Sequence, residues 1–322
     1  MSGGSPAKLQ SMVVSYQAVL LIAFGGPTSS EEIRPFLERV TQGAAIPPQR
    51  LEDVARHYEA VGGKSPLNEI TSRQARAVQK LLRDRGMGFS VYVGMRNAAP
   101  FFVDVLRQMA RDGIERALGF ILSSHHTDAS WGRYQRNVAD ARLEIGAGAP
   151  EIDYCAGWYD HPLFIQTWCE LIEEGFAGIA RSQHPATPLV FTAHSVPVSM
   201  ANRSSYVEEL EITARSVAEK IGHKNWSIAY QSRSGKPGDA WLEPDINLVI
   251  RDLSVRGATD VVVAPIGFVC DHVEVLYDLD IEARKTAAQC GIQLHRASCP
   301  NDHTTFIQMI ADVIARSVQA RQ

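Results

Sequence analysis

Two residues, His194 and Glu274, carry side chains that can bind a divalent metal ion and accept protons. His194 closes the apolar run 188–194, and Glu274 lies shortly after the apolar run 260–267. A lone histidine in such a place can also be a core residue bonded to the backbone. Glu274 can equally complete a capping box with Asp271, the expected N-cap of the next helix. Positions just beyond predicted strands favour a chemical role, because parallel sheets bind ligands at the carboxyl ends of their strands.

Three carboxylates follow one another at intervals of four residues, at Glu274, Asp278 and Glu282. This spacing places them along one face of a helix predicted over 274–290. Like charges at that spacing repel one another unless they are solvated or bind a cation. The row is therefore either a solvated surface stripe or a path for metal ions that starts opposite His194.

Several familiar sites are excluded by missing motifs. Segment 25–27 lacks the third glycine of a dinucleotide fingerprint, no serine lies in a GxSxG elbow, and neither HExxH nor structural-zinc spacing occurs. These absences argue against a dehydrogenase, an ATPase and a hydrolase. Since one imidazole and one carboxylate suit Fe²⁺ but do not close a metal site, the other ligands must come from the substrate. A flat, tetradentate macrocycle that loses two pyrrole protons fits this requirement.

Short apolar runs alternate with longer amphipathic segments along the chain. The runs are hydrophobic throughout, as parallel strands covered on both faces require, and they span 18–24, 90–95, 117–123, 151–155, 188–194, 227–231, 260–267 and 292–296. Helices are predicted between them over 30–40, 71–84, 100–112, 206–221, 244–255 and 274–290. This alternation predicts βαβ units and an α/β fold.

The two halves of the chain resemble each other. The first strand ends in AFGGP at 23–27, and the fifth ends in AHSVP at 193–197. A second pair of similar segments is 119–126 and 265–272. We therefore predict two similar Rossmann-like lobes, each a four-stranded parallel sheet flanked by helices, with a ligand bound between them. The expected divisions are a disordered leader at 1–15, a first lobe at 16–157, a second lobe at 158–300, and a C-terminal helix within 301–322 that packs back on the first lobe.

The composition fits a globular protein with a large core, since the 322 residues are 45% hydrophobic and 21% charged. The formal net charge of −4 gives no reason to expect nucleic acid as a partner. No run of 18 apolar residues occurs, so no stable membrane insertion is expected. The five cysteines include no CxxC pair, which indicates free thiols in a reducing compartment and hence a cytoplasmic location.

Five strings resemble the ferrochelatase family, and within it most closely the coproporphyrin III ferrochelatases. They are LLIAFGGP at 20–27, HYEAVGGKSPL at 57–67, FTAHSVP at 191–197, WLEPD at 241–245 and GFVCDHVEVLYDLDIEA at 267–283. The resemblance covers nearly the whole chain from about residue 18. It implies a chelatase-like fold and insertion of Fe²⁺ into coproporphyrin III, giving Fe-coproporphyrin III (coproheme) in haem biosynthesis. It also implies that His194 and Glu274 bind the iron and accept the pyrrole protons, and that Asp278 and Glu282 continue the path for metal or protons.

The resemblance further assigns contacts with the macrocycle and its propionates. These contacts fall on Tyr58, Ser65 and Tyr134, and Arg96 is the expected charge partner of a propionate. Trp241 is placed in the pocket wall, with a core tryptophan as the alternative. Asp271, at a strand end, is also expected to bind the substrate.

Some positions depart from the family pattern. Phe24 stands where several relatives carry a tyrosine that ligates iron, and phenylalanine cannot coordinate. His125 lies where other relatives place such a ligand, so we expect it to take that role, with a loop hydrogen bond as the alternative. At 41–42, threonine and glutamine replace arginine, which leaves propionate recognition by that segment open. His57 replaces an arginine near the outer metal path, where it is expected to bind metal with the two outer carboxylates.

The resemblance also bears on cofactors and partners. Fe²⁺ is expected as a substrate, no cofactor is expected to be permanently bound, and no iron–sulfur cluster is predicted, because Trp131 occupies one cluster position and no cysteine follows Cys299. Together with the string at 267–280, the short and mildly apolar lip at 43–48 favours coproporphyrin and a soluble enzyme. A monomer is expected, with the porphyrin and a downstream coproheme decarboxylase as partners. The alternatives are a protoporphyrin IX ferrochelatase, a related tetrapyrrole chelatase and, from another class, a non-catalytic porphyrin or haem carrier.

Overall fold

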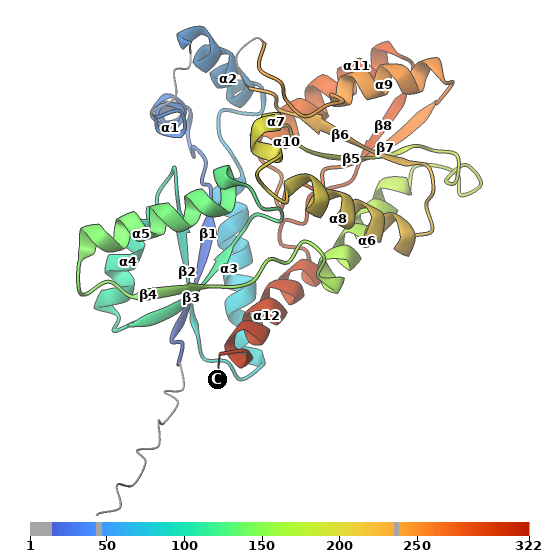
Figure 1. The fold of residues 1–322 in the computed structure, drawn as a ribbon. Helices are drawn as coiled ribbons and strands as arrows, with labels where there is room; N and C mark the ends of the chain where they lie inside the picture. Colours follow the sequence, from blue (N-terminus) through green and yellow to red (C-terminus); the bar gives the residue numbers. More distant parts are fainter. Residues whose placement is uncertain (1–14, 43–46, 235–237, 322) are drawn as a thin grey trace, which may run out of the picture.

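Two four-stranded parallel sheets form the framework of the protein, described by a computed structural model over residues 15–42, 47–234 and 238–321. The first sheet has the strand order β2-β1-β3-β4, and the second has the equivalent order β6-β5-β7-β8 (Figure 1). All the strand pairings are parallel, and helices flank both sheets. The predicted α/β fold with two similar Rossmann-like lobes is confirmed.

The first half of the chain forms the first sheet and its helices. Its strands are β1 (Ala18–Ala23), β2 (Ser90–Met95), β3 (Arg116–Ile121) and β4 (Glu151–Tyr154). Its helices are α1 (Ile33–Val40), α2 (Pro48–Ala60), α3 (Leu67–Asp84), α4 (Phe102–Arg111) and α5 (Arg133–Ile145). A 3₁₀ turn, η1 (Ser30–Glu32), precedes α1, and a π-helical turn, η2 (Asp128–Gly132), precedes α5.

The second half forms the second sheet in the same way. Its strands are β5 (Leu189–His194), β6 (Trp226–Gln231), β7 (Asp260–Ala264) and β8 (Gln293–Arg296). Its helices are α6 (Pro162–Phe176), α7 (Val198–Ala201), α8 (Tyr206–Lys220), α9 (Ile246–Val255), α10 (Val273–Tyr277), α11 (Arg284–Gln289) and α12 (Thr304–Gln319). A π-helical turn, η3 (Asp278–Ala283), joins α10 to α11.

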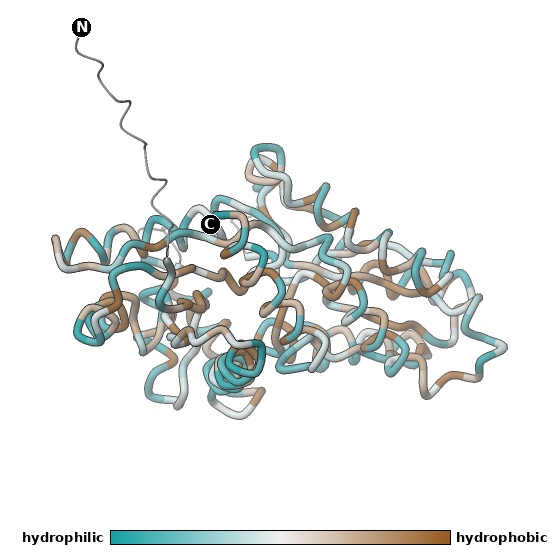
Figure 2. Tube along the Cα trace, turned by 90° about the horizontal axis from the view of Figure 1, so that it is seen from below, coloured by the Kyte–Doolittle hydropathy of each residue, from teal (hydrophilic) through white to brown (hydrophobic). Residues whose placement is uncertain are grey.

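The central strands are buried on both faces. Every residue of β1 is buried, and the first five residues of β5 are buried as well. Figure 2 shows hydrophobic segments running through the middle of each half, with hydrophilic segments towards the outside. Crossover helices cover both faces of a parallel sheet, which is why these strands are apolar throughout. Helix α12 packs on α3 and β3 of the first half and on α6 of the second, so it joins the two halves (Figure 1).

The predicted helix over 274–290 is interrupted. It consists of α10, the π turn η3 and α11. A π turn replaces i→i+4 hydrogen bonds by i→i+5 bonds, and a hydrophobic period of 3.6 residues does not reveal it. The prediction of one continuous α-helix was therefore wrong here. Helices α2, α5, α6 and α7 were not among the predicted helices, and in α2 and α5 charged and polar residues obscure the apolar face.

Two predicted segments fall largely outside the described residues: the leader at 1–15, of which only residue 15 is described, and the lip at 43–48, described only from residue 47. In the part of the chain that is described, no helix is both long and apolar enough to cross a membrane.

Candidate active site between the two halves

A cavity of about 440 Å³ lies between the two halves of the chain, and both halves line it. Residues that follow the carboxyl ends of β1, β3, β5 and β7 contribute to its wall. Parallel sheets bind ligands at this edge. The predicted site residues among its lining are Phe24, Tyr58, Ser65, His125, Tyr134, His194, Trp241 and Glu274. The cavity thus brings eight residues predicted from sequence to one place.

His194 is the last residue of β5, and the backbone fixes its ring. Its Nδ1 donates a short hydrogen bond to the carbonyl of Ser195. Because a carbonyl only accepts, the Nδ1 atom carries a proton and Nε2 is left to face Glu274. The chain also needs Gly267 here, since a Cβ at that position would lie 2.5 Å from the Cβ of Ala193 in β5. Glycine therefore lets the segment after β7 approach the strand that carries His194.

Glu274 lies in the first turn of α10, and His272 is the N-cap of that helix. The Nδ1 atom of His272 accepts a hydrogen bond from the backbone N–H of Glu274 at 3.1 Å. This arrangement directs the Glu274 carboxylate towards the cavity, where its Oε1 lies 3.6 Å from Nε2 of His194. The side chains of His194 and Glu274 are 31% and 48% exposed, so both remain accessible from the cavity.

Asp271 is not the N-cap that the sequence predicted. Its carboxylate accepts hydrogen bonds from Arg296 at 2.8 Å and from Asn301 at 2.7 Å, while His272 takes the N-cap position. Asp271 is also absent from the described lining of the cavity. A guanidinium is a stronger partner for a carboxylate than the free N–H groups of a helix start. Arg296 comes from the end of β8, and the local sequence around Asp271 could not reveal it.

The His194–Glu274 pair behaves as an ion pair. Burial alone would lower the pKa of His194, but the neighbouring Glu274 carboxylate outweighs it and raises that pKa to about 9. Burial would likewise raise the pKa of Glu274, but His194 outweighs it and lowers that pKa to about 2. In the substrate-free protein at neutral pH, an imidazolium therefore faces a carboxylate.

The outer carboxylates lead from the cavity towards the surface. Asp278 is buried and accepts a short hydrogen bond from the hydroxyl of Ser232. Burial, followed by the negative charges of Glu274 and Glu282, raises the pKa of Asp278 to about 7. Glu282 is exposed at the far end of the row. The three carboxylates therefore form a line from the cavity through a buried group to solvent.

His57 faces this line from α2, but it stacks on an aromatic ring. Its imidazole lies parallel to the ring of Tyr277, with 3.7 Å between the centroids and 8° between the planes. Burial and the charge of Arg50 lower the pKa of His57. Across residues 15–42, 47–234 and 238–321, no three His, Cys, Asp or Glu side chains form a group that could hold a metal ion. The structure thus does not gather His57, Asp278 and Glu282 into the metal site that was expected.

The wall from the first half is aromatic and polar. Phe24 packs edge-on against Phe36, with the ring centroids 6.1 Å apart, and the guanidinium of Arg96 lies 5.9 Å from the Phe24 ring centroid. Arg96 stands behind Phe24 and does not line the described cavity. Burial raises the pKa values of Tyr58 and Tyr134, so both phenols stay neutral and can donate hydrogen bonds.

His125 lines the cavity with both ring nitrogens already in hydrogen bonds. Nδ1 lies 2.9 Å from the hydroxyl of Ser124, and Nε2 lies 3.1 Å from the hydroxyl of Thr213 in α8. The Thr213 hydroxyl donates to the carbonyl of Tyr159 at 2.8 Å, so it accepts from Nε2 of His125. Burial lowers the pKa of His125 to about 4, and the ring is neutral. This geometry favours the hydrogen-bonding alternative over the expected role as an iron ligand.

Trp241 joins the wall from the segment after β6. It pairs with Pro197 in an isolated β-bridge, and its Nε1 is buried without a hydrogen-bond partner in the described structure. A buried N–H without a partner is unusual in folded proteins. The atom itself is buried, so other atoms of Trp241 form the surface that lines the cavity.

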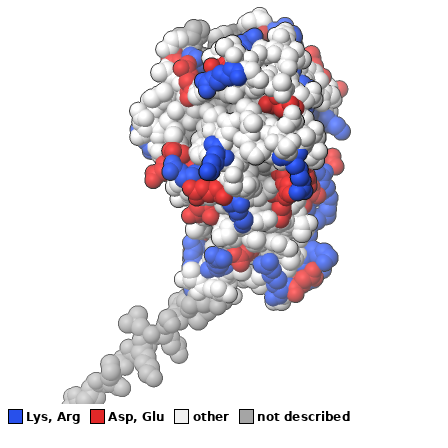
Figure 3. Space-filling model, turned by 90° about the vertical axis from the view of Figure 1, so that its right-hand side faces the viewer, with Lys and Arg blue, Asp and Glu red and all other residues white. Residues whose placement is uncertain are grey.

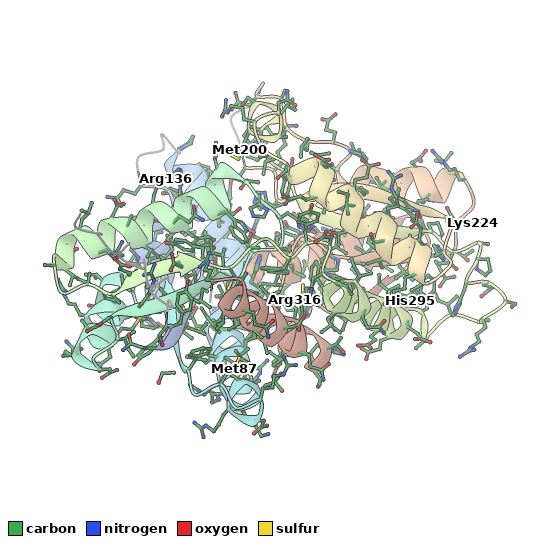
Figure 4. The ribbon with its side chains drawn as sticks, turned by 60° about the horizontal axis from the view of Figure 1, so that its bottom comes forward. Met87, Arg136, Met200, Lys224, His295 and Arg316 are labelled. Atoms are coloured by element: carbon green, nitrogen blue, oxygen red, sulfur yellow. The ribbon has the colours of Figure 1, made fainter. Side chains whose placement is uncertain are left out.

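Several lining or supporting residues were not predicted. Tyr206 lines the cavity and donates to the His194 carbonyl at 2.9 Å, and Met200 lines it from α7 (Figure 4). Gln231 contacts the backbone of Glu274. A usable signal existed for Gln231, because it closes the apolar run 227–231 just as His194 closes its own run.

Comparisons with known proteins agree with this geometry. The family model described as Ferrochelatase matches residues 16–318. A coproporphyrin III ferrochelatase of Mycolicibacterium vanbaalenii is 40% identical over 304 residues, which cover 94% of this chain and 90% of that protein. A protein of Rhodopirellula baltica named ferrochelatase is 39% identical over 301 residues, with 93% and 85% covered.

A solved structure of SirB from Bacillus subtilis with Fe³⁺ has a similar fold. The TM-score is 0.57, and the match covers 96% of this chain and 99% of that chain. The sequence identity is 10%, so this likeness concerns the fold alone.

Proposed function

The chain belongs to the ferrochelatase family, and from this membership we propose that it inserts Fe²⁺ into coproporphyrin III to give Fe-coproporphyrin III. One observation carries the proposal: Nε2 of His194 and Oε1 of Glu274 lie 3.6 Å apart and open into a cavity lined by both halves. The imidazole and the carboxylate are suited to hold Fe²⁺, and the cavity is suited to hold the macrocycle that supplies the other ligands.

The charges of the site suggest how protons leave. Insertion of each Fe²⁺ releases two pyrrole protons, and the free protein already holds one proton on His194 at neutral pH. Fe²⁺ and an imidazolium repel one another, so metal binding at Nε2 requires that this proton leaves first. Asp278, whose pKa is raised to about 7, can take up and release protons near neutral pH. Glu282, exposed at the end of the row, then passes them to solvent.

The choice of substrate rests on the relatives and on the wall from the first half. Tyr58, Ser65 and Tyr134 offer hydroxyl groups to carboxylates at the edge of a macrocycle. Coproporphyrin III carries four propionates and protoporphyrin IX carries two, so hydroxyl donors in the wall favour the former. The relative of Rhodopirellula baltica is named only ferrochelatase, and protoporphyrin IX is therefore the second candidate substrate.

A direct comparison of the two porphyrins tests this proposal. Purified protein is supplied with Fe²⁺ and with either coproporphyrin III or protoporphyrin IX in detergent-free anaerobic buffer, and kcat/KM is measured from the absorbance of the product. We expect coproporphyrin III to be preferred about tenfold or more. His194→Ala serves as the control and should lose activity with both porphyrins. Equal use of the two, or preference for protoporphyrin IX, would overturn the substrate assignment.

We further propose a cytoplasmic, monomeric enzyme without a resident cofactor or iron–sulfur cluster, which passes its product to a coproheme decarboxylase. All five cysteines are free thiols, which supports a reducing compartment. Acidic and basic side chains are interspersed on the face shown in Figure 3, so this face offers no single-sign field to nucleic acid. Metal analysis and light scattering of the purified protein test the cofactor and monomer proposals.

A further inference from the structure

Gln231 contacts the backbone on both sides of the proposed metal site, although it does not line the described cavity. It is the last residue of β6 and the register partner of His194, the last residue of β5. The N–H of Ser195 donates to the Gln231 carbonyl at 2.8 Å and completes the ladder beyond His194. The backbone that carries His194 is therefore fixed to that of Gln231.

The side chain of Gln231 reaches the backbone of Glu274. Its Nε2 donates to the Glu274 carbonyl at 2.9 Å, and its Oε1 accepts from the hydroxyl of Thr192 at 2.9 Å. A carbonyl only accepts and a hydroxyl can donate, so these two partners determine which way the amide points. Gln231 and Thr192 are 1% and 0% exposed, and water does not compete for either bond.

Helix α10 gives the Glu274 backbone little regular helical structure. Helix α10 has five residues and runs directly into the π turn η3, so a regular helical ladder does not extend beyond it. The Glu274 carbonyl accepts the N–H of Asp278, and the amide of Gln231 is its second donor. Buried Val275 packs α10 against the second sheet, and the hydrogen bond from Gln231 ties the Glu274 backbone directly to β6.

We propose that Gln231 is a positioning residue that sets the separation between Nε2 of His194 and Oε1 of Glu274. The inference rests on the proposed function, because this separation matters only if both groups handle the metal. Small displacements of reacting groups lower rates strongly, even when binding is unchanged. Thr192 acts one step further away, by orienting the Gln231 amide.

The test removes these hydrogen bonds while keeping the size of the side chain. Gln231→Met keeps the length of the side chain and removes both bonds. We expect kcat for Fe²⁺ insertion into coproporphyrin III to fall about tenfold, while KM for the porphyrin stays within about twofold. Thr192→Val should lower kcat about threefold. Thr192→Ser keeps the hydroxyl and should keep kcat near the wild-type value. Fluorescence quenching measures porphyrin binding, and thermal unfolding is recorded for each variant.

The outcomes separate this inference from the proposed function. Unchanged kcat in Gln231→Met, with an active wild type, overturns the positioning role alone. So does a parallel loss of kcat, porphyrin affinity and unfolding midpoint, which indicates a general loss of structure. If Gln231→Met does not fold, Thr192→Val and Thr192→Ser test the positioning role instead. Equal values of kcat for these two variants would contradict it. An inactive wild type overturns the proposed function and this inference with it.

Discussion

The two halves of the molecule share one topology but place different chemistry at the same strand ends. His194 ends β5, and Phe24 follows β1 at the corresponding point of the repeated pattern. Phe24 offers an aromatic ring that packs against Phe36, whereas His194 offers a nitrogen that faces Glu274. The first half therefore supplies a wall, and the second half supplies the groups that can bind metal.

A second pair of equivalent segments shows how small the structural difference is. Asp128 follows His126 by two residues in the first half, just as Glu274 follows His272 in the second. In the first half Thr127 caps the helical turn, and Asp128 is exposed. In the second half the cap is His272, one position earlier in the equivalent segment, and Glu274 lines the cavity. Asp128 is thus the first residue of the π turn η2, whereas Glu274 is the second residue of α10, and only the second carboxylate lines the cavity.

The largest expected effect comes from removing the charge of Glu274. Glu274→Gln should lower Fe²⁺ insertion by about a hundredfold or more, because the metal loses a charged ligand and the protons lose an acceptor. Porphyrin binding should remain, since the wall from the first half is untouched. Initial rates and fluorescence quenching measure the two effects.

The equivalent change in the first half is the matched control. Asp128→Asn should leave the rate within about twofold, because Asp128 is exposed. Normal metallation by Glu274→Gln would contradict the assigned role. Loss of porphyrin binding in that variant would show that Glu274 holds the macrocycle rather than the metal.

A smaller effect, with a distinctive pH dependence, is expected at Asp278. As a proton acceptor Asp278 must be ionised, so the wild-type rate should rise as the pH passes through about 7, where its pKa lies. Asp278→Asn should lower the rate about tenfold and remove this step from the pH profile. A retained step near neutral pH would assign the titration to another group.

Asp278→Asn, which should lower the rate, should raise the stability of the folded protein. The ordinary pKa of 3.8 is raised to about 7 in the folded protein. Wild-type stability should therefore fall as the pH rises through this window, because the unfolded chain releases the proton more readily. Asparagine does not titrate, so Asp278→Asn should gain on the order of 2 kcal/mol over wild type between about pH 4.5 and about pH 8. Chemical unfolding at the two pH values measures this gain, and a constant difference would contradict a buried, titrating carboxylate.

The sequence was sufficient to predict the site residues at strand ends. It was insufficient where contacts with residues far away in the chain determine a side chain's role. His194 and Glu274 were identified because one closes and the other follows an apolar run in a repeated α/β pattern. The role of Asp271 was misjudged because its partner Arg296 lies at the end of β8. The π turn η3 was missed because it breaks the 3.6-residue period. The environment of His125 depends on Thr213, 88 positions away and on the other half.

The smallest expected effect on the metal site concerns His125, which lines the cavity from the first half. With Fe-coproporphyrin III bound, His125→Ala should leave the Soret and charge-transfer bands in place, because both ring nitrogens are committed to Ser124 and Thr213. The free energy of unfolding should fall by about 2–4 kcal/mol, since a buried ring and its hydrogen bonds to Ser124 and Thr213 are lost. Thr213→Val is the matched variant, because it frees Nε2 of His125 while keeping the ring. A band shift in His125→Ala would show that the product draws this imidazole out of its hydrogen bonds and onto the iron, and the first half would then share in metal binding.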